Sequence, residues 1–182
     1  MRSRKLLYPL AVLAALILIP MTLTPNPALA GDAQKDIQAH KACPYCGMDR
    51  AQWNFSRMLI VYNDGTEVGT CALRCTAVDL VNNIDKFPEK ISVADYNTKE
   101  LLDAENAVWV IGGDQQGVMT KRAKWAFADQ VGAEAFIKEH GGDLANFDQV
   151  IEAAYDDIHQ DTKLIRDRRK AKREKMKMEK TQ

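Results

Sequence analysis

The segment Cys43-Pro44-Tyr45-Cys46-Gly47-Met48 constrains this chain most, because it places two thiols and a thioether in one short stretch. Pro44 inside the segment and Gly47 near its end favour a tight turn, which lets both thiols face one point. Thiolates and thioethers together select soft metal ions, Cu(I) above all, whereas structural zinc sites use Cys and His. The segment therefore predicts a soft-metal site, with a structural zinc knuckle, a redox dithiol and a disulfide as alternatives.

A second pair of cysteines, Cys71 and Cys75, follows the first pair after a gap of 24 residues. Apolar residues recur at helical spacing over 72–84, which predicts a helix that begins near Cys71 and carries both cysteines on one face. Two pairs with these spacings also suit a zinc site with four thiolates, the strongest alternative to a soft-metal site. That alternative leaves Met48 and Met119 as ordinary core residues.

One histidine lies near the first pair of cysteines. His40 stands three positions before Cys43, close enough for its imidazole to complete or gate a metal site, although a histidine in a polar segment is more often solvated. The candidate ligands are therefore Cys43, Cys46, Met48, Cys71, Cys75 and His40.

The first 30 residues are typical of a secretory signal peptide. Residues 1–5 are basic, 6–23 are almost all apolar, and the small residues of 28–30 precede a cleavage point at Gly31. If the segment is not cleaved, it anchors the protein in the membrane, and in either case the remainder is exported, to the periplasm or beyond. Because no Cys precedes Cys43, a lipid cannot be attached at the cleavage point. Export also keeps disulfides among the alternatives.

Charge divides the exported part into two regions. Residues 31–162 hold 12 basic and 22 acidic side chains, whereas residues 163–180 hold ten basic and three acidic ones. We expect a flexible polar lead-in over 31–42, one metal-binding domain over 43–160, and a basic tail over 161–182 that is an exposed helix or disordered. The tail is either solvated or in contact with anionic lipid or an acidic partner. We expect no binding to nucleic acid.

Hydrophobic periodicity predicts an α+β fold. We expect strands over 53–62, 66–71, 91–96, 107–111 and 124–128, helices over 72–84, 130–140 and 148–159, and a short strand or loop over 143–147. Asn63-Asp64-Gly65 predicts a hairpin turn, and 117–119 opens the second arm of another hairpin. Residues 98–102 are expected to form a helical turn or a loop. Residues 52–96 and 106–147 thus repeat the order strand, strand, helix, strand within one body.

The chain carries no clear catalytic motif. A redox Cys-x-x-Cys normally begins a helix whose dipole lowers the pKa of the first thiol, but here the motif precedes a hairpin, and Gly47 would interrupt such a helix. No Ser-His-Asp ordering, phosphate-binding glycine loop or pair of catalytic carboxylates stands out. We expect a protein that is not an enzyme, and a thiol-disulfide oxidoreductase is the weaker alternative.

Several short segments occur in a characteristic order along the chain. They are Cys43 to Met48, Asp64-Gly65 with Cys71, Ala107 to Val110, Gly117 to Met119, Trp125 to Phe127, Ala135-Phe136, His140 to Gly142, and Phe147-Asp148. Together they resemble the NosL family of nitrous oxide reductase accessory proteins, over roughly Lys41 to Ile158.

The resemblance implies an exported Cu(I)-binding protein that hands copper to the maturing centres of nitrous oxide reductase, and a fold of two ββαβ units. Cys46 and Met48 match the family's Cys-Gly-Met element, and Met119 matches its later Met, so these three are the favoured copper ligands. Cys43 matches the first Cys of the motif. The chain departs from the family where members often carry a lipid, because it has no Cys at its cleavage point. Two further departures are the pair Cys71 and Cys75, which suggests a site richer in sulfur, and the long basic tail. Together they suggest that a different enzyme receives the copper.

Overall fold

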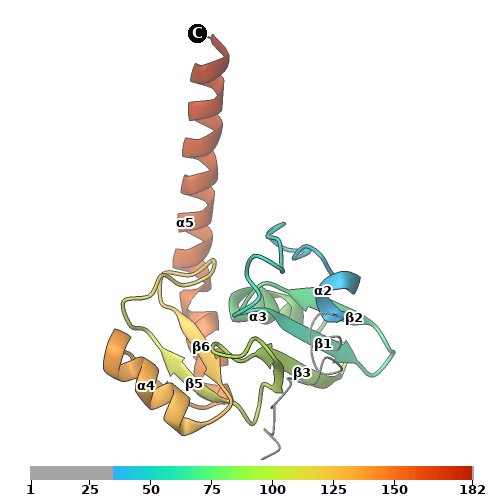
Figure 1. Cartoon of the computed structure of the whole chain (residues 1–182). Helices are drawn as coiled ribbons and strands as arrows, with labels where there is room; N and C mark the ends of the chain where they lie inside the picture. Colours follow the sequence, from blue (N-terminus) through green and yellow to red (C-terminus); the bar gives the residue numbers. More distant parts are fainter. Residues whose placement is uncertain (1–34, 182) are drawn as a thin grey trace, which may run out of the picture.

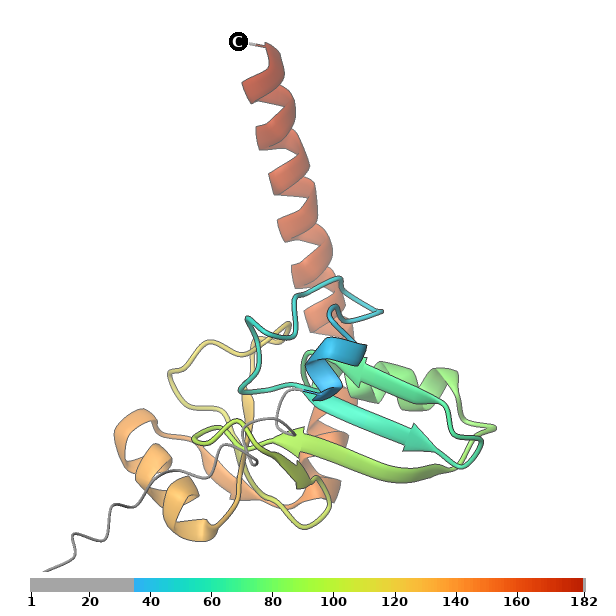
Figure 2. The same ribbon diagram turned by 45° about the vertical axis from the view of Figure 1, so that its right-hand side comes forward.

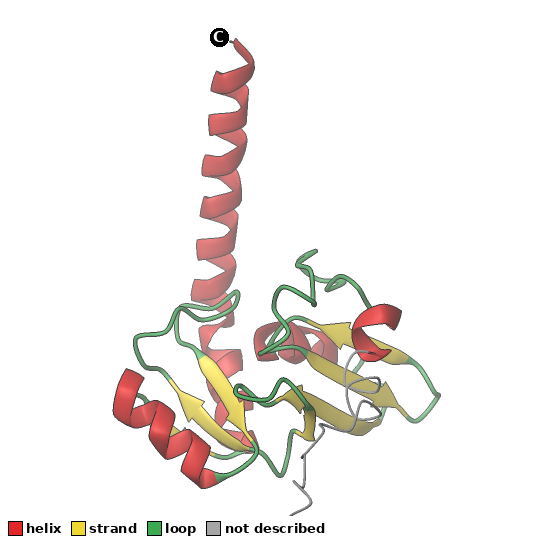
Figure 3. Cartoon of the chain, in the orientation of Figure 1, coloured by secondary structure: helices red, strands yellow, loops and turns green. Residues whose placement is uncertain are grey.

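The structure is a computed structural model that describes residues 35–181. These residues form two antiparallel sheets with helices packed on them (Figure 3). The predicted signal peptide lies outside the described residues. Within residues 35–181, no helix is both long and apolar enough to cross a membrane.

The first sheet is built from β1 (Met58–Tyr62), β2 (Glu67–Thr70), β3 (Pro88–Ala94) and β4 (Leu101–Asp103), in the order β2-β1-β3-β4. β1 and β2 form the predicted hairpin, in which Gly65 adopts a φ of +80°, a conformation that glycine accepts without steric cost. Helix α3 (Leu73–Asn82) connects β2 to β3, and β3 returns antiparallel to the other side of β1.

The second sheet repeats this connectivity with β5 (Val108–Ile111), β6 (Lys124–Phe127) and β7 (Asp143–Ala145), in the order β6-β5-β7. Helix α4 (Gln130–His140) connects β6 to β7. It begins where the Asp129 side chain accepts a hydrogen bond from the amide of Gly132 at 2.8 Å, as an N-cap does. The predicted α+β fold of two ββαβ units is thus confirmed, with β4 as an added edge strand of the first unit.

The last helix, α5 (Phe147–Thr181), is 35 residues long. Its first turns pack against α3 and β5, and Val150 and Ala154 enter the core. The rest of α5 extends away from the body (Figures 1 and 2). No Gly or Pro occurs after Gly142, so nothing in the sequence stops the helix once it has begun. The predicted helix over 148–159 and the basic tail therefore form one continuous helix. Of the two alternatives predicted for the tail, an exposed helix or disorder, the structure shows the helix.

Three local predictions were wrong. The strand expected from residue 53 begins at Met58, because residues 50–56 form turns instead, and residues 101–102 begin β4 where a helical turn or loop was expected. Residues 117–119 belong to the loop before β6 and not to a hairpin arm. β4 forms because the edge of β3 is available to pair with it, whereas the turns over 50–56 are held by local hydrogen bonds such as that from the amide of Trp53 to the carbonyl of Asp49.

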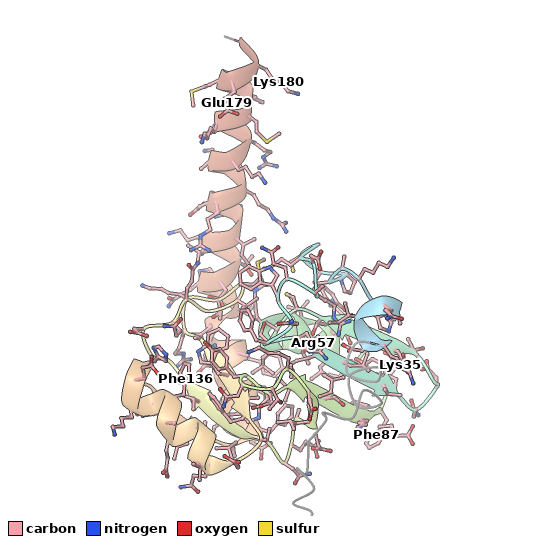
Figure 4. The ribbon with its side chains drawn as sticks, viewed as in Figure 1. Lys35, Arg57, Phe87, Phe136, Glu179 and Lys180 are labelled. Carbon is pink, nitrogen blue, oxygen red and sulfur yellow. The ribbon has the colours of Figure 1, made fainter. Side chains whose placement is uncertain are left out.

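The lead-in contains a short helix, α2 (Lys35–Ala39), that the sequence did not indicate. Asp36 of this helix is buried, and its carboxylate lies 2.7 Å from the guanidinium of Arg50 and 2.9 Å from that of Arg57. Figure 4 shows Arg57 inside the body and Lys35 on α2 beside it. The buried ion pairs hold this part of the lead-in against the first sheet.

Two hydrophobic clusters make up the core. One packs the first sheet against α3 and α5, and includes Met58, Ile60 and Trp109. The other lies where the two units meet, and includes Trp125 and Phe136 together with three of the four cysteines. A parallel bridge between Asp95 and Ala126 joins the sheets at this point. The cysteines therefore lie in the seam between the two halves of the fold.

Candidate metal centre

The four cysteines converge on one point. The Sγ atoms of Cys43, Cys46, Cys71 and Cys75 all lie within 4.8 Å of one another. Cys46 and Cys71 are 3.3 Å apart, and Cys71 and Cys75 are 3.8 Å apart. All four are free thiols in the structure, so the alternative of two disulfides is not what it shows. Metal–sulfur bonds of about 2.3 Å in a tetrahedron separate the sulfurs by about 3.8 Å, so the group is the right size to surround one ion.

The turn that carries the first pair is closed by backbone hydrogen bonds. The amide of Gly47 donates to the carbonyl of Cys43 at 2.8 Å, and the amide of Cys43 donates to the carbonyl of Met48 at 2.9 Å. Gly47 has a φ of +76°, which favours glycine at this position. A bridge between Ala42 and Asp49 closes the base of the turn. The predicted tight turn is therefore present, and it directs both thiols inward.

The second pair lies where β2 ends and α3 begins. Cys71 follows the last residue of β2, and Cys75 is in the first turn of α3, so the helix starts after Cys71 and not at it. The hydroxyl of Ser56 donates to the carbonyl of Cys71 at 2.8 Å and fixes that junction. No side chain caps the N-terminus of α3. Because Cys71 precedes α3 and Cys75 lies in its first turn, the positive end of the helix lies beside the sulfur cluster, where it favours negative charge.

Access to the cluster is uneven. Cys43, Cys71 and Cys75 are at most 2% exposed, whereas Cys46 is half-buried. An incoming group can therefore reach the cluster at Cys46. The other three thiols are shielded by the core.

The four thiols share protons unequally. Hydrogen bonds from Cys46, Cys71 and Cys75 hold the pKa of the Cys43 thiol far below its ordinary value. The pKa values of Cys71 and Cys75 are raised, first by their hydrogen bonds with Cys43 and also by burial. The hydrogen bond with Cys43 raises the pKa of Cys46, but those with Cys71 and Cys75 outweigh it, so this pKa is lowered as well. The cluster thus favours negative charge on Cys43 and Cys46 and protons on Cys71 and Cys75. A metal ion bound by these thiols would take the place of the protons.

The family model for NosL matches residues 34–155, about two thirds of the chain. The chain belongs to the NosL family. Its fold also resembles the crystal structure of the copper chaperone NosL from Shewanella denitrificans, with a TM-score of 0.51 and 22% sequence identity. That similarity covers 62% of this chain and 90% of the other, and it supports the fold alone. None of the curated proteins matches the sequence.

Two methionines of this NosL protein lie beside the cysteines. Met48 and Met119 are both half-buried and pack against the hydrophobic cluster that contains Cys43, Cys71 and Cys75. Met119 also shares a cavity with Cys46. Its φ is +58°, a conformation that residues other than glycine rarely adopt and that tends to occur at functional sites. Coordination by the two thioethers stays a prediction, and this arrangement is compatible with it.

His40 is not part of the cysteine group. Its ring Nε2 lies 3.4 Å from the carboxylate of Glu67, at the far end of β2 from Cys71. Its Cβ also packs so closely on Gly69 that a side chain there would clash with it. The role of His40 as a ligand stays a prediction.

Sequence reasoning missed a carboxylate that holds the turn of residues 43–48, the candidate metal-binding turn. Tyr45, between the first two cysteines, donates its hydroxyl hydrogen bond to Asp79 of α3, and Tyr62 of β1 donates to the other oxygen of Asp79 at 2.5 Å. Burial and the hydrogen bond with Asp79 raise the pKa of Tyr45 to about 12. The available signal was an Asp on the apolar face of a predicted helix, four residues after Cys75.

Proposed function

We propose that this chain is an exported copper chaperone that binds Cu(I) in the cysteine cluster and is not an enzyme. The observation that carries the proposal is the convergence of four free thiols within 4.8 Å, three buried and one accessible. Membership in the NosL family supports it. Soft sulfur ligands favour Cu(I) over harder ions.

The uneven burial suits delivery of the metal. Cys43, Cys71 and Cys75 hold the ion from inside, while Cys46 occupies the accessible side, next to Met119. An incoming sulfur ligand can bind the ion at this side before Cys46 leaves it, so the metal is never released to solvent. The adjacent thioether of Met119 is a weaker, neutral ligand that can hold the ion during this exchange.

The receiving protein follows from the family resemblance. We propose that it is nitrous oxide reductase or a similar copper enzyme, or the complex that assembles it. The predicted signal peptide places the exchange in the periplasm or another exported location, and an uncleaved signal would keep the protein at the membrane. The basic residues of α5 permit contact with an anionic membrane surface.

A structural zinc site is the second candidate, and the four-thiolate arrangement is the observation that favours it. Zinc in structural sites is commonly bound by four cysteines in a tetrahedron. A closed site of that kind needs no accessible ligand and no methionine beside it. The exposure of Cys46 and the position of Met119 therefore favour copper.

The deciding experiment is an anaerobic titration of the exported chain with Cu(I) and with Zn(II), each against a competing chelator. We expect much tighter binding of Cu(I), and weaker Cu(I) binding in Cys46→Ser and Met119→Leu. Met176→Leu, an exposed methionine on α5, is the matched control and should bind normally. A preference for Zn(II), or affinities unaffected by Cys46→Ser, would overturn the proposal. Turnover of a disulfide substrate by the metal-free chain would instead support an oxidoreductase.

A further inference from the structure

A cavity of about 320 Å³ opens beside Cys46, and its walls are rich in arginine. Tyr45, Cys46 and Met119 line one side of it. We call it the arginine cavity after four residues that line it, Arg74 of α3 and Arg166, Arg169 and Arg173 of α5. None of the residues that line the cavity is acidic. An accessible metal ligand thus stands at the edge of a strongly cationic hollow.

The positions on α5 explain how this surface forms. Arg166, Arg169 and Arg173 are spaced by three and four residues, so they lie on one face of the helix. Thr162 and Ile165 belong to the same face and also line the cavity. Because α5 runs unbroken from the core, this face is held beside the metal-binding turn.

The guanidinium groups are poorly neutralised by the protein itself. Arg74 donates to the hydroxyl of Thr162 at 2.9 Å, while its Nε is buried with no hydrogen-bond partner among the described residues. Arg169 approaches the carbonyl of Cys46 at 3.4 Å. The carboxylate nearest Arg166 is that of its neighbour Asp167, at 3.9 Å and exposed. With four guanidinium groups and no carboxylate among its lining residues, the cavity favours an anionic group.

The surface is larger than a small anion needs. Beyond the cavity, α5 carries further basic residues up to Lys180, and residues 163–180 hold ten basic side chains against three acidic ones. Figure 4 shows Glu179 and Lys180 near the far end of the helix, well away from the body. Eighteen helical residues span about 27 Å, the dimension of a protein surface and not of a small molecule. Charge complementarity over that length favours an acidic protein.

We propose that the arginine cavity and the face of α5 that carries Arg166, Arg169 and Arg173 dock an acidic surface of the protein that exchanges copper with this chain. This inference rests on the proposed function. Docking brings a sulfur ligand of the partner to Cys46. A sulfur–copper bond to the partner then forms as the bond from copper to Cys46 breaks, and copper stays Cu(I) throughout. When the incoming group is a thiol, its proton passes to the departing Cys46 thiolate.

The test uses two synthetic peptides with the same Cys-containing copper acceptor, one flanked by glutamates and the other by serines and glycines. Copper transfer from the loaded chain to each peptide is followed by stopped flow. We expect transfer to the acidic peptide to be about tenfold faster at low salt, and the difference to vanish at high salt. Equal rates for the two peptides at low salt would overturn the proposal.

Matched variants locate the effect on the helix. The cavity variant combines Arg166→Gln, Arg169→Gln and Arg173→Gln. The control variant combines three substitutions on the opposite face of α5, Arg168→Gln, Lys172→Gln and Lys175→Gln. Both remove the same charge from α5. We expect the first to abolish the preference for the acidic peptide and the second to change it by less than about twofold. Equal effects of the two variants would show that only total charge matters, and would overturn docking at the cavity.

Further measurements distinguish an acidic protein from other ligands that the cavity could bind. Anisotropy of a labelled acidic peptide measures docking to the metal-free chain, so a failure to bind copper cannot be mistaken for a failure to dock. Displacement of that peptide by millimolar phosphate or citrate would assign the cavity to a small anion. If the cavity variant lost more of its binding to phosphatidylserine vesicles than of its binding to the acidic peptide, the surface would be assigned to a membrane. If the cavity variant lost Cu(I) affinity as well as transfer rate, the arginines would act by balancing the negative charge of the metal–thiolate group. The proposal would then fail.

Discussion

The hydroxyl of Tyr45 donates a hydrogen bond to Asp79, and this contact ties the candidate metal-binding turn, residues 43–48, to helix α3. Asp79 is only 1% exposed, and its second oxygen accepts from Tyr62 of β1. The same helix carries Cys75 in its first turn, and Cys71 lies directly before it. One buried carboxylate therefore fixes the position of the first pair of cysteines relative to the second.

Tyr45→Phe is expected to loosen the metal-binding turn. The ring stays while its hydrogen bond to Asp79 is lost, which should lower the free energy of unfolding by about 1 to 2 kcal/mol. Because the turn is then free to move away from Cys71 and Cys75, Cu(I) should dissociate several-fold faster. Chemical denaturation and transfer of Cu(I) to an excess of chelator measure the two effects.

Tyr62→Phe is the matched control for this variant, since it removes the other hydrogen bond of Asp79 without touching the turn. It should lower stability by a similar amount and leave the rate of Cu(I) dissociation nearly unchanged. If both variants accelerate dissociation equally, Asp79 acts only through the general stability of the fold.

Asp36→Ala is expected to be among the most destabilising substitutions in the domain. It leaves the buried guanidinium groups of Arg50 and Arg57 without their carboxylate, and breaking a buried pair in this way costs about 3 to 5 kcal/mol. Asp85→Ala, at an exposed Asp, is the control and should change stability by less than about 0.5 kcal/mol. Urea denaturation of the two variants checks the prediction, and a small effect of Asp36→Ala would show that α2 does not secure the fold.

The regular elements could be predicted because their signals are local. The hairpin at Asp64-Gly65, the α3 periodicity over 72–84 and the cap at Asp129 each lie within a few residues of the element that they specify. β4 could not be predicted in this way, since residues 101–103 become a strand only by pairing with β3. Likewise, α2 is fixed by buried ion pairs to Arg50 and Arg57, which are distant in sequence.

The convergence of the four cysteines was easier to predict than the surroundings of the candidate site. The spacing of the four cysteines indicates a common site, and the structure brings their sulfurs together. The link from Tyr45 to Asp79 joins positions 34 residues apart, and Arg169 meets Cys46 across 123 residues. Such contacts depend on how the two units and α5 pack, which no local pattern specifies.

Removal of the metal should leave the domain folded. The cluster around Met58 and Trp109 contains no cysteine, so the packing of this part of the core does not involve the candidate ligands. We expect bound Cu(I) to raise the melting temperature, since it binds the native state alone, and a chelator to lower it without loss of the far-ultraviolet circular dichroism signal. Unfolding by a chelator at room temperature would instead match a structural zinc module, in which metal binding supplies the folding free energy.

The contact between Asp157 of α5 and Lys124 of β6 should make the free energy of unfolding depend on pH. Its carboxylate lies 2.5 Å from the ammonium of Lys124, which is 3% exposed, and 2.9 Å from the guanidinium of Arg122. Burial alone would raise the pKa of Asp157, but hydrogen bonds from Arg122 and Lys124 outweigh it and lower the pKa below its ordinary value of 3.8. The charged carboxylate therefore stabilises the fold above this value, and that contribution is lost as the pH falls through the lowered pKa of the folded state.

Asp157→Asn should accordingly cost about 2 to 3 kcal/mol at pH 7, less than for a fully buried pair because Asp157 remains partly exposed. Denaturation curves of the wild type and the variant should then converge as the pH is lowered from 5 to below about 3, since protonation removes the same charge from the wild type. Asp156→Asn, at the exposed neighbouring position, should show neither the loss at pH 7 nor the convergence. A difference between wild type and Asp157→Asn that stays constant with pH would mean that the carboxylate acts by packing and not by its charge.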